Sequence, residues 1–538
     1  MIFGHLVLHN NKGKTMSINC IRTLIEDANI SNPNKVALVF GNEKLTYNEL
    51  FTKVNQIAYY LSELDLPKGS RIGVYSNKGI DQVVAILAIL STQYVLVPLT
   101  KLLKPEQVEY IISDCDIKCI ITDKIKLESI EEIKFNGHII SYQTSHKDLP
   151  SFEEIYKYYN KPYFCDVNGH DNAVITYSFG LSGKPNGIVI SHRNLIDSAR
   201  VVSQYLHLEQ DDIISGLLIF NLDYGLNQIF CSLYKRATLA LHRFVLPSDF
   251  FNHIINDKIT VLPIMPINIT EMFDEDGHRL PSAQLLKNVR IITSSGGNVT
   301  AKMIADIEKS FSSAKFYSMH GLTEAFRSTY LDPAQLKIRP ESIGKAIPDV
   351  ELYVIDENGN ECAPRVVGEL IHRGGYIYKG FWNAPKTTEQ RFKSIKILEN
   401  VINLEGQLSD EIVVKTGDYV YKDEEGYFYF VSRHDDMIKT RGFRVNPFEI
   451  ESVVEREIKN IERCAVFSIE NEEIEEEIVL VYTGKNELNS SEILFELKNH
   501  LASYMIPAKI IYKKSLPLIP SDKNKINKDE LKKELTSK

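Results

Sequence analysis

A glycine-rich segment with two serine hydroxyls is the first part of this sequence that could do chemistry. It reads YSFGLSGKPNG from Tyr177 to Gly187 and follows a strand-like stretch, Ala173–Tyr177. Glycines let backbone N–H groups surround phosphate oxygens, and hydroxyls add further donors. The segment is not a Walker loop, because its glycine spacing differs and no Ser or Thr follows the lysine. Taken alone, it predicts either a phosphate-binding loop or a surface turn between strands.

Two further segments carry acids that could hold other parts of a nucleotide. His320–Glu324 places Thr323 and Glu324 after a glycine, where they could contact a phosphate and Mg²⁺, a cation that takes few carboxylates besides phosphate oxygens. Both could equally cap the start of a helix. Lys415–Tyr419 carries Asp418, which could accept ribose hydroxyl hydrogen bonds worth roughly 1.5–3 kcal/mol each, or form a plain turn.

Two charged segments lie towards the C-terminus. Ser432–Val445 alternates positive and negative side chains, which suits either a hinge that stays hydrated in two positions or a solvated linker. Pro520–Lys528 is rich in lysine. One of its lysines could reach into a site on a larger domain, although a basic tail would have the same composition.

These segments, in their order and spacing, resemble the family of AMP-forming adenylating enzymes, which includes acyl-CoA synthetases, luciferases and the adenylation domains of peptide synthetases. Further similar motifs lie at Leu45–Leu50, Ser191–Leu195, Gly368–Leu370 and Tyr378–Trp382. The resemblance runs from about residue 20 to residue 531. Within the family, the chain looks most like stand-alone ligases that load an acid onto a separate carrier protein.

The resemblance implies that ATP activates a carboxylic acid, with Mg²⁺ as cofactor, and that a thiol then takes the acyl group from the adenylate. It assigns nucleotide contacts to Ser178, Gly180, Ser182, Gly183 and Lys184 in the glycine-rich loop, to His320 and Gly321, to Thr323 at the phosphate, to Glu324 at the Mg²⁺, and to Asp418 and Arg433 at the ribose. Lys525 matches the catalytic lysine. Asp435 matches the hinge about which a small domain rotates, so that Thr440–Arg444 replaces Lys525 near the thiol.

Several positions depart from the family pattern. Asn186 stands where the loop usually carries a lysine, Leu181 where it carries Thr or Ser, and Phe179 where it carries a small polar residue. His320 replaces the usual tyrosine that stacks on adenine, and Asn524 replaces the glycine before Lys525. The loop therefore has fewer donors than usual, and we expect weaker handling of pyrophosphate without loss of activity.

The segment Asn221–Gln228 lies where the family builds its acyl pocket. Asp223 falls on the position that binds the α-ammonium group in amino-acid-activating members, and such a group needs a partner because breaking a buried ion pair costs roughly 3–5 kcal/mol. Asp223 could instead cap a helix that begins near Tyr224, or pair with Arg327. The same alignment gives the side-chain pocket as Tyr224, Asn227, Met319, Arg327 and Ser328, whose polar members argue against a long alkyl tunnel.

Alternating strand-like and helix-like stretches must position these residues. Val36–Phe40 and Arg71–Tyr75 predict strands, whereas Leu50–Leu61 and Asp81–Leu90 have apolar residues at helical spacing. This alternation predicts an α/β fold. A chain of 538 residues is too long for one core. We expect a large multi-layer N-terminal domain with mixed sheets and helices at 17–432, and a small mobile α+β lid domain at 433–538.

The predicted small domain alternates helices with strands. Its helix-like stretches are Pro447–Ile458 and Ser491–Ala502, and its strand-like stretches are Arg463–Ile469 and Glu477–Tyr482. The last ten residues are mostly charged and are expected to fray.

The overall composition excludes some partners. The net charge is -9 and the pI is near 5.9, so neither nucleic acid nor an anionic membrane is expected to bind. The seven cysteines form no Cys-x-x-Cys pair, which favours a reduced, cytoplasmic protein. Val83–Leu99 is too interrupted for a membrane span and predicts a buried helix followed by a buried strand. Met1–Thr15 is a poor signal peptide, and Met16 is an alternative start.

Three hypotheses about function stay open. The first is a ligase that adenylates a small amino acid and loads a carrier protein. The second is an acyl-CoA synthetase for a carboxylic acid without an amino group. The third is a non-catalytic nucleotide-binding protein that kept the fold, against which Lys525 and Glu324 count. No phosphopantetheine-bearing domain is visible, so a carrier protein or coenzyme A would supply the thiol.

Overall fold

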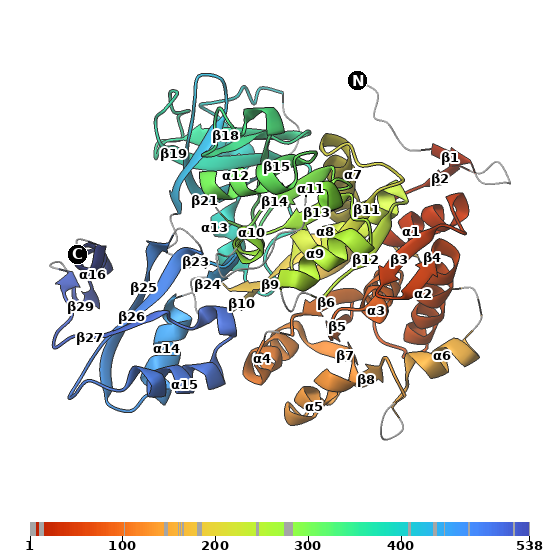
Figure 1. Cartoon of the computed structure of the whole chain (residues 1–538), viewed down its shortest axis with the longest axis horizontal. Helices are drawn as coiled ribbons and strands as arrows, with labels where there is room; N and C mark the ends of the chain where they lie inside the picture. Colours follow the sequence, from red (N-terminus) through yellow and green to blue (C-terminus); the bar gives the residue numbers. More distant parts are fainter. Residues whose placement is uncertain are drawn as a thin grey trace.

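The expected alternation of strands and helices is present along the chain (Figure 1). Strands β3 (Val36–Phe40) and β5 (Arg71–Tyr75) have the predicted bounds, and the two predicted helices lie within α2 (Tyr47–Ser62) and α3 (Ile80–Leu90). The computed structural model describes residues 7–9, 15–101, 103–144, 149–159, 161, 163, 166–179, 185–243, 247–273, 283–297, 299–406, 410–433, 438–445, 447–471, 474–519 and 522–536.

A six-stranded sheet carries the glycine-rich segment at its edge. Its order is β10 (Pro185–Ser191), β9 (Asn172–Phe179), β6 (Val95–Leu99), β5, β7 (Ile117–Thr122) and β8 (His138–Ser141). The parallel strands β5, β6 and β7 are almost continuously buried, as expected for strands covered on both faces. Val83–Leu99 is a buried helix followed by a buried strand, as predicted, because α3 leads into β6.

A second sheet joins a parallel half to an antiparallel half. The parallel half comprises β3, β12 (Thr238–Leu241), β11 (Ile213–Gly216), β13 (Val261–Ile264), β14 (Ile291–Ser294) and β15 (Lys315–His320), with β4 (Glu43–Thr46) antiparallel at its edge. The antiparallel half comprises β16 (Thr329–Leu331), β17 (Ser342–Ala346), β22 (Phe428–Arg433), β21 (Ile412–Lys422), β19 (Gly368–Gly374) and β18 (Val350–Ile355), and β20 (Phe392–Ser394) pairs with β21. Because β17 pairs with both β16 and β22, the ends of β15 and β21 belong to one continuous sheet.

Helices α7 (His192–Tyr205) and α8 (Asp223–Lys235) lie between the two sheets and line the candidate active site. Helix α7 contacts β9 and β10 of the first sheet, whereas α8 contacts β11 and β12 of the second, and the two helices pack on each other. The other helices before residue 392 are α1 (Ile21–Ser31), α4 (Pro105–Cys115), α5 (Lys124–Glu132), α6 (Phe152–Tyr158), α9 (Pro247–Asn256), α10 (Pro266–Met272), α11 (Ala283–Leu286), α12 (Ala301–Ser310) and α13 (Pro385–Arg391).

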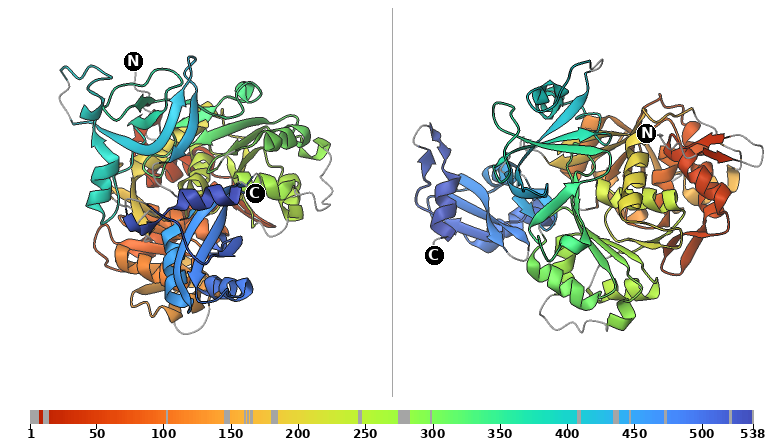
Figure 2. Two further views of the ribbon diagram at one scale, coloured as in Figure 1. Left: turned by 90° about the vertical axis from the view of Figure 1, so that its left-hand side faces the viewer. Right: turned by 90° about the horizontal axis from the view of Figure 1, so that it is seen from above.

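The C-terminal part has its own sheet and its own hydrophobic clusters. The sheet comprises β24 (Phe443–Val445), β23 (Ile438–Thr440), β26 (Glu475–Gly484), β25 (Ile461–Asn471) and β27 (Lys509–Tyr512), with helices α14 (Pro447–Glu457) and α15 (Ser490–His500). The predicted helices and strands of this part are therefore confirmed. Its clusters contain described residues from Ile438 onwards, and it stands out from the rest of the chain (Figure 2).

The expectation that the last ten residues fray is wrong. Residues from Lys528 form helix α16 (Lys528–Thr536), which packs against β25. Leu531 is fully buried, and Leu535, one helical turn later, joins the same cluster. Lys528 also forms an ion pair of 2.8 Å with Glu451 of α14. Two leucines on one face thus outweigh the charged composition.

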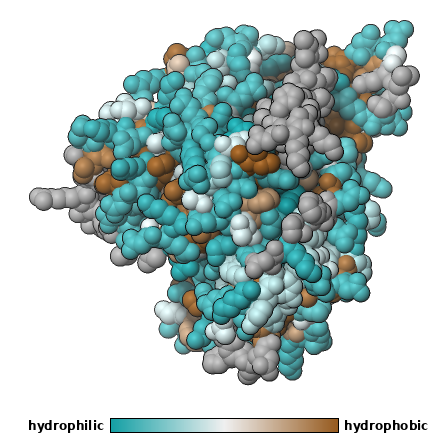
Figure 3. Space-filling view, turned by 90° about the vertical axis from the view of Figure 1, so that its right-hand side faces the viewer, coloured by the Kyte–Doolittle hydropathy of each residue, from teal (hydrophilic) through white to brown (hydrophobic). Residues whose placement is uncertain are grey.

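The surface and the cysteines agree with the composition. No helix among the described residues is long and apolar enough to cross a membrane. The face shown in Figure 3 is mostly hydrophilic, with hydrophobic residues scattered over it. The six cysteines in the described part of the chain are free thiols, and five of them are buried.

Candidate active site

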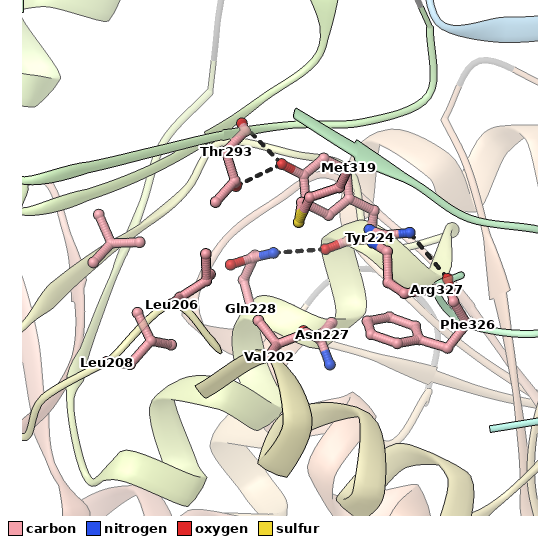
Figure 4. A pocket seen from close by; sticks show the side chains of 11 residues that line it. Val202, Leu206, Leu208, Tyr224, Asn227, Gln228, Thr293, Met319, Phe326 and Arg327 are labelled. Atoms are coloured by element: carbon pink, nitrogen blue, oxygen red, sulfur yellow. Dashed lines mark hydrogen bonds between the residues drawn. The ribbon is translucent and has the colours of Figure 1, made fainter. Parts of the chain in front are cut away.

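A small cavity lies beside α7 and α8, near the carboxyl ends of β14 and β15 (Figure 4). Such strand ends are where α/β sheets commonly place ligands. The cavity volume is about 10 Å³, which is room for about one water molecule. Its wall comprises Val202, Leu206, Leu208, Tyr224, Asn227, Gln228, Val261, Thr293, Met319, Phe326 and Arg327.

Asp223 is the first residue of α8 and directly precedes the cavity wall. The N-cap is Leu222, so Asp223 lies inside the first turn, where a carboxylate interacts favourably with the helix dipole. Its Oδ1 accepts a hydrogen bond of 2.7 Å from the Tyr224 N–H. Burial, followed by the charge of this carboxylate, raises the pKa of the buried Tyr378 hydroxyl well above its usual range.

Arg327 is a buried cation in the wall of the cavity, with only 3% of its surface exposed. Its Nη1 donates to the Phe326 carbonyl at 3.1 Å, whereas Nε and Nη2 have no hydrogen-bond partner among the described residues. The expected alternative, a hydrogen bond from Arg327 to Asp223, is not present. The guanidinium carbon lies 4.7 Å from the ring centres of both Tyr224 and Phe326, which favours the cation through the π faces.

Three further predicted pocket residues are held by hydrogen bonds in the wall. The Tyr224 hydroxyl contacts Thr293 Oγ1 at 2.7 Å. Asn227 donates to Ser198 Oγ at 3.0 Å and accepts from the Cys231 thiol at 3.0 Å. The Tyr205 hydroxyl donates to Met319 Sδ at 3.0 Å. These bonds fix the wall, so the side chains are preorganised.

Ser328, the last predicted pocket residue, does not line the cavity. Its Oγ lies 3.0 Å from Nδ1 of His372 on β19, and both side chains are fully buried. Burial lowers the pKa of His372 to about 3, so the imidazole is neutral at physiological pH. The pair therefore links the loop after β15 to the antiparallel half of the sheet.

His320 and Asp418 meet although 98 residues separate them in the sequence. His320 ends β15 and Asp418 lies in β21, and the imidazole Nε2 is 3.0 Å from the carboxylate Oδ2. Arg433 is the cross-strand neighbour of Asp418 on β22, and its side chain lies outside the described part. The Asp418 side chain has no exposed surface, so a ribose reaches it only when the covering groups move.

Thr323 and Glu324 lie in a loop after β15 and not at a helix start. Glu324 is buried, and its Oε1 lies 3.8 Å from Nε of Arg391. Gly321 leaves room for the Phe326 carbonyl, which would lie 2.6 Å from an added Cβ. The described residues contain no cluster of three metal-ligating side chains. One carboxylate fits Mg²⁺ that takes its other ligands from nucleotide phosphates and water.

Most of the other predicted site residues lie outside the described residues. Ser178 lies near the end of β9, opposite Asn186 of β10. The other four loop residues and the hinge residue lie outside the described residues: Gly180, Ser182, Gly183, Lys184 and Asp435. Lys525 belongs to β29 (Asp522–Ile526), which pairs with β28 (Leu518–Ile519), and its side chain is not described.

The sequence analysis gave no role to three residues that the structure brings to predicted pocket residues. Tyr378, in the Tyr378–Trp382 motif, interacts electrostatically with Asp223. Tyr205 and His372 lie in stretches that read as ordinary core helix and strand. Only their partners, Met319 and Ser328, pointed to this region of the fold.

The small domain contacts the large one through the β23–β24 turn. Strand β24 packs beside β9, and an added Cβ at Gly442 in this turn would lie 2.9 Å from the Met265 sulfur. Gly442 has a φ of +74°, which favours glycine. Strand β29, with Lys525, lies at the outer end of the small domain, away from α8 and β15 (Figures 1 and 2).

The fold and this site are those of a two-domain enzyme that activates its substrate with a nucleotide. The family model described as AMP-binding enzyme matches residues 25–382. The chain therefore belongs to the AMP-binding enzyme family.

Its curated relatives include large synthases. Tyrocidine synthase 1 of Brevibacillus parabrevis is 25% identical over 509 residues, which cover 94% of this chain and 44% of the relative. Gramicidin S synthase 1 of Brevibacillus brevis is 25% identical over 521 residues, covering 96% and 45%. The chain thus spans less than half the length of these relatives.

Solved structures share the fold at lower identity. The amide bond synthetase of Marinactinospora thermotolerans superposes with a TM-score of 0.82 at 16% identity, covering 95% of this chain and 99% of that one. The o-succinylbenzoate CoA synthetase of Bacillus subtilis, a double mutant bound with a CoA product analogue, gives 0.79 at 22% identity, covering 95% and 98%. The same synthetase with its acyl-adenylate intermediate gives 0.67 at 22% identity, covering 95% and 97%.

Proposed function

We propose that this chain uses ATP to adenylate a small amino acid and passes the aminoacyl group to the phosphopantetheine thiol of a separate carrier protein in the cytoplasm. The observation that carries the amino-acid part is Asp223, a carboxylate in the first turn of α8 beside the acyl cavity. An ammonium group brought into such a place needs an anionic partner. The similarity to tyrocidine synthase 1 and gramicidin S synthase 1 supports the carrier-protein part.

In the first half-reaction, a substrate carboxylate oxygen forms a bond to the α-phosphorus of ATP, and pyrophosphate leaves. In this proposal Asp418 contacts the ribose and His320 the adenine, and Ser178 with the glycine-rich loop contacts the phosphates. Lys525 holds the carboxylate and the developing charge, which typically contributes 10²–10³ in rate, or ~2.7–4 kcal/mol, for one preorganised donor. Glu324 would hold a Mg²⁺ ion, which would supply neutralisation of the phosphate charge.

In the second half-reaction, a thiol sulfur attacks the acyl carbon of the adenylate. The thioester forms, AMP leaves, and the thiol proton passes to solvent. The small domain, residues 433–538, turns about Asp435 between the two steps, and such gating is common when one site serves two reactions. The contact of Gly442 with Met265, with β29 at the outer end, supports assigning this arrangement to the second step.

The first test is ATP–pyrophosphate exchange with the proteinogenic amino acids beside a panel of simple carboxylic acids. Exchange with one or two amino acids is the expected result, because the cavity is small and Asp223 is close to it. Exchange restricted to acids without an amino group would remove the amino-acid assignment. No exchange with any acid would contradict the proposed reaction.

An acyl-CoA synthetase for an acid without an amino group is the second candidate. One observation favours it: the chain superposes on a CoA synthetase bound with its CoA product analogue at a TM-score of 0.79. Incubating the adenylate-loaded enzyme with coenzyme A or with a phosphopantetheinylated carrier protein separates the two acceptors. An enzyme that releases AMP with coenzyme A and not with the carrier supports this second candidate.

A further inference from the structure

We infer that Arg327 is the receptor for a second acidic group, so that the acid adenylated here carries two carboxylates, one of which reacts while the other pairs with the guanidinium. The inference rests on the proposed adenylation and narrows its substrate class. Aspartate and glutamate are acids of this kind with an amino group, and succinate and glutarate are acids of this kind without one.

The burial of Arg327 without an anionic partner is the first argument. A guanidinium stays charged in proteins, and a buried charge without a partner is costly. Other arginines of the large domain have such partners: Arg236 pairs with Asp27 at 2.8 Å, and Arg290 pairs with Asp212. Arg327 has Nε and Nη2 unsatisfied within the described residues. A group retained at this cost indicates an anion that binds there.

The position of these donors is the second argument. Arg327 lines the cavity between Tyr224 and Phe326 (Figure 4). The other wall amides already have partners, because Asn227 bonds to Ser198 and Cys231, and the Gln228 amide donates to the Tyr224 carbonyl at 2.8 Å. The guanidinium therefore supplies strong donors to a ligand, and the two rings hold its plane.

The size of the cavity limits the anion. A volume of about 10 Å³ accommodates about one water, and Val202, Leu206 and Leu208 form an apolar part of the wall. A carboxylate is compact and planar and matches a guanidinium with two parallel hydrogen bonds. Any of these groups displaces part of the wall, and a carboxylate displaces less of it than a phosphate or an aromatic ring does.

The charge of Asp223 completes the pattern. The Asp223 carboxylate raises the pKa of the buried Tyr378 hydroxyl, and the Arg327 guanidinium lowers it. A negative group and a positive group therefore both act on one buried tyrosine. An amino acid with an acidic side chain presents an ammonium to Asp223 and a carboxylate to Arg327.

The test compares matched substrates in ATP–pyrophosphate exchange: aspartate with asparagine, glutamate with glutamine, succinate and glutarate with butyrate, and alanine as a neutral amino acid. We expect kcat/KM for the best dicarboxylic acid to exceed that of its neutral partner by roughly 30-fold or more, as for loss of one partner of a buried charge pair. In Arg327→Met the ratio of kcat/KM for the dicarboxylic acid to kcat/KM for its neutral partner falls to near one. Arg327→Lys keeps part of this preference.

Thermal unfolding without substrate provides a second readout. If Arg327 serves ligand binding, Arg327→Met unfolds at the same or a higher temperature than the wild type, because it removes an unsatisfied buried charge. Arg236→Met is the matched control. It breaks an internal ion pair, so it lowers the unfolding temperature and leaves the ratio between acidic and neutral substrates unchanged.

Three outcomes separate the inference from the proposed function. Preference for dicarboxylic acids that is lost in Arg327→Met supports the inference. Equal or better use of alanine or of the neutral amides by the wild type overturns the inference and leaves adenylation intact. Absence of exchange with every acid overturns the proposed function, and the inference falls with it. Within the first outcome, aspartate over succinate indicates an ammonium at Asp223.

Discussion

The acyl cavity and the contact between the two domains are built in opposite ways. The cavity is enclosed by packed side chains of the large domain, and its polar atoms are fixed by internal hydrogen bonds. The domain contact uses few, polar links, such as Gln107 to Glu449 at 2.9 Å and Lys104 to the Lys498 carbonyl at 2.7 Å. Choice of acid and timing of the two half-reactions should therefore be carried by different residues.

Lys525→Ala should give the largest effect and separates the two half-reactions. We expect adenylation to fall by roughly 10²–10³, as for removal of one preorganised donor, while thiol transfer from preformed adenylate continues. Pyrophosphate exchange and single-turnover transfer measure the two steps. Lys514→Ala, an exposed lysine of the same domain, is the control. Wild-type exchange in Lys525→Ala would remove the role assigned to this lysine.

Asp223→Asn tests whether the cavity selects the acid without affecting thiol transfer. For an amino-acid substrate, kcat/KM should fall by about 10²-fold, since breaking a buried ion pair costs roughly 3 kcal/mol or more. The rate of thiol transfer from the adenylate should change little. Equal loss in both steps would contradict the separation between cavity and domain contact. Unchanged exchange would indicate that the substrate is an acid without an amino group.

The local elements were predictable from the sequence, and the long-range contacts were not. Strands such as β3 and β5 are short apolar runs between turn residues, so their patterns suffice. The tail at Lys528–Thr536 was predicted wrongly, because composition hides two leucines on one helical face. The pairing of Ser328 with His372 joins the loop after β15 to β19, a long-range contact that no local pattern encodes.

The residues predicted to bind the nucleotide also come together through long-range strand pairing that local sequence patterns do not predict. Asp418 and His320 each stood in a segment that the sequence singled out, and the structure brings them within 3.0 Å. Their contact follows from β17 pairing with strands on both sides, a topology that alternation alone does not predict. Tyr378 lies in the Tyr378–Trp382 motif, but its electrostatic interaction with Asp223 depends on the fold.

Asp418→Asn tests whether nucleotide binding is independent of the choice of acid. Loss of a charged acceptor should raise KM for ATP by about tenfold, near the lower end of the 1.5–3 kcal/mol for charged hydrogen bonds. Discrimination among acids should stay the same, because Asp418 does not line the cavity. Initial rates over a range of ATP concentrations give the measurement. A changed order of preference among acids would show that the two sites are coupled.

Glu449→Gln should give the smallest effect on turnover and a distinct pH dependence. Burial raises the pKa of Glu449 to about 7, with Gln107 of α4 bonded to it and Tyr504 of η3 (Ser503–Met505) nearby. Glu106 and His500 lie 3.8 Å apart at the same contact. Glu449 therefore keeps its proton to a higher pH while the two domains are in contact than it does when it is exposed to water.

The direction in which pH changes the strength of the contact between the domains follows from the raised pKa of Glu449. The contact should weaken as pH rises from about 4.5 to about 7, and stay constant above that range. In Glu449→Gln this dependence should vanish and the contact should be tighter at neutral pH. Energy transfer between dyes on exposed positions of α5 and α15 reports the distance between domains. An identical pH profile in wild type and variant would exclude Glu449 as its cause.

The layout of the cavity in the sequence has a consequence for how such enzymes diversify. Every residue that lines it lies between Val202 and Arg327. The segment His320–Glu324, predicted to contact the nucleotide, lies inside this interval as well, whereas Ser178, Asp418 and Lys525 lie outside it. A single genetic exchange of this interval between two relatives would therefore replace the acid-selecting wall as a unit, together with the His320–Glu324 segment. A new building block can arise by such recombination only where the exchanged segment still fits the nucleotide residues on both flanks.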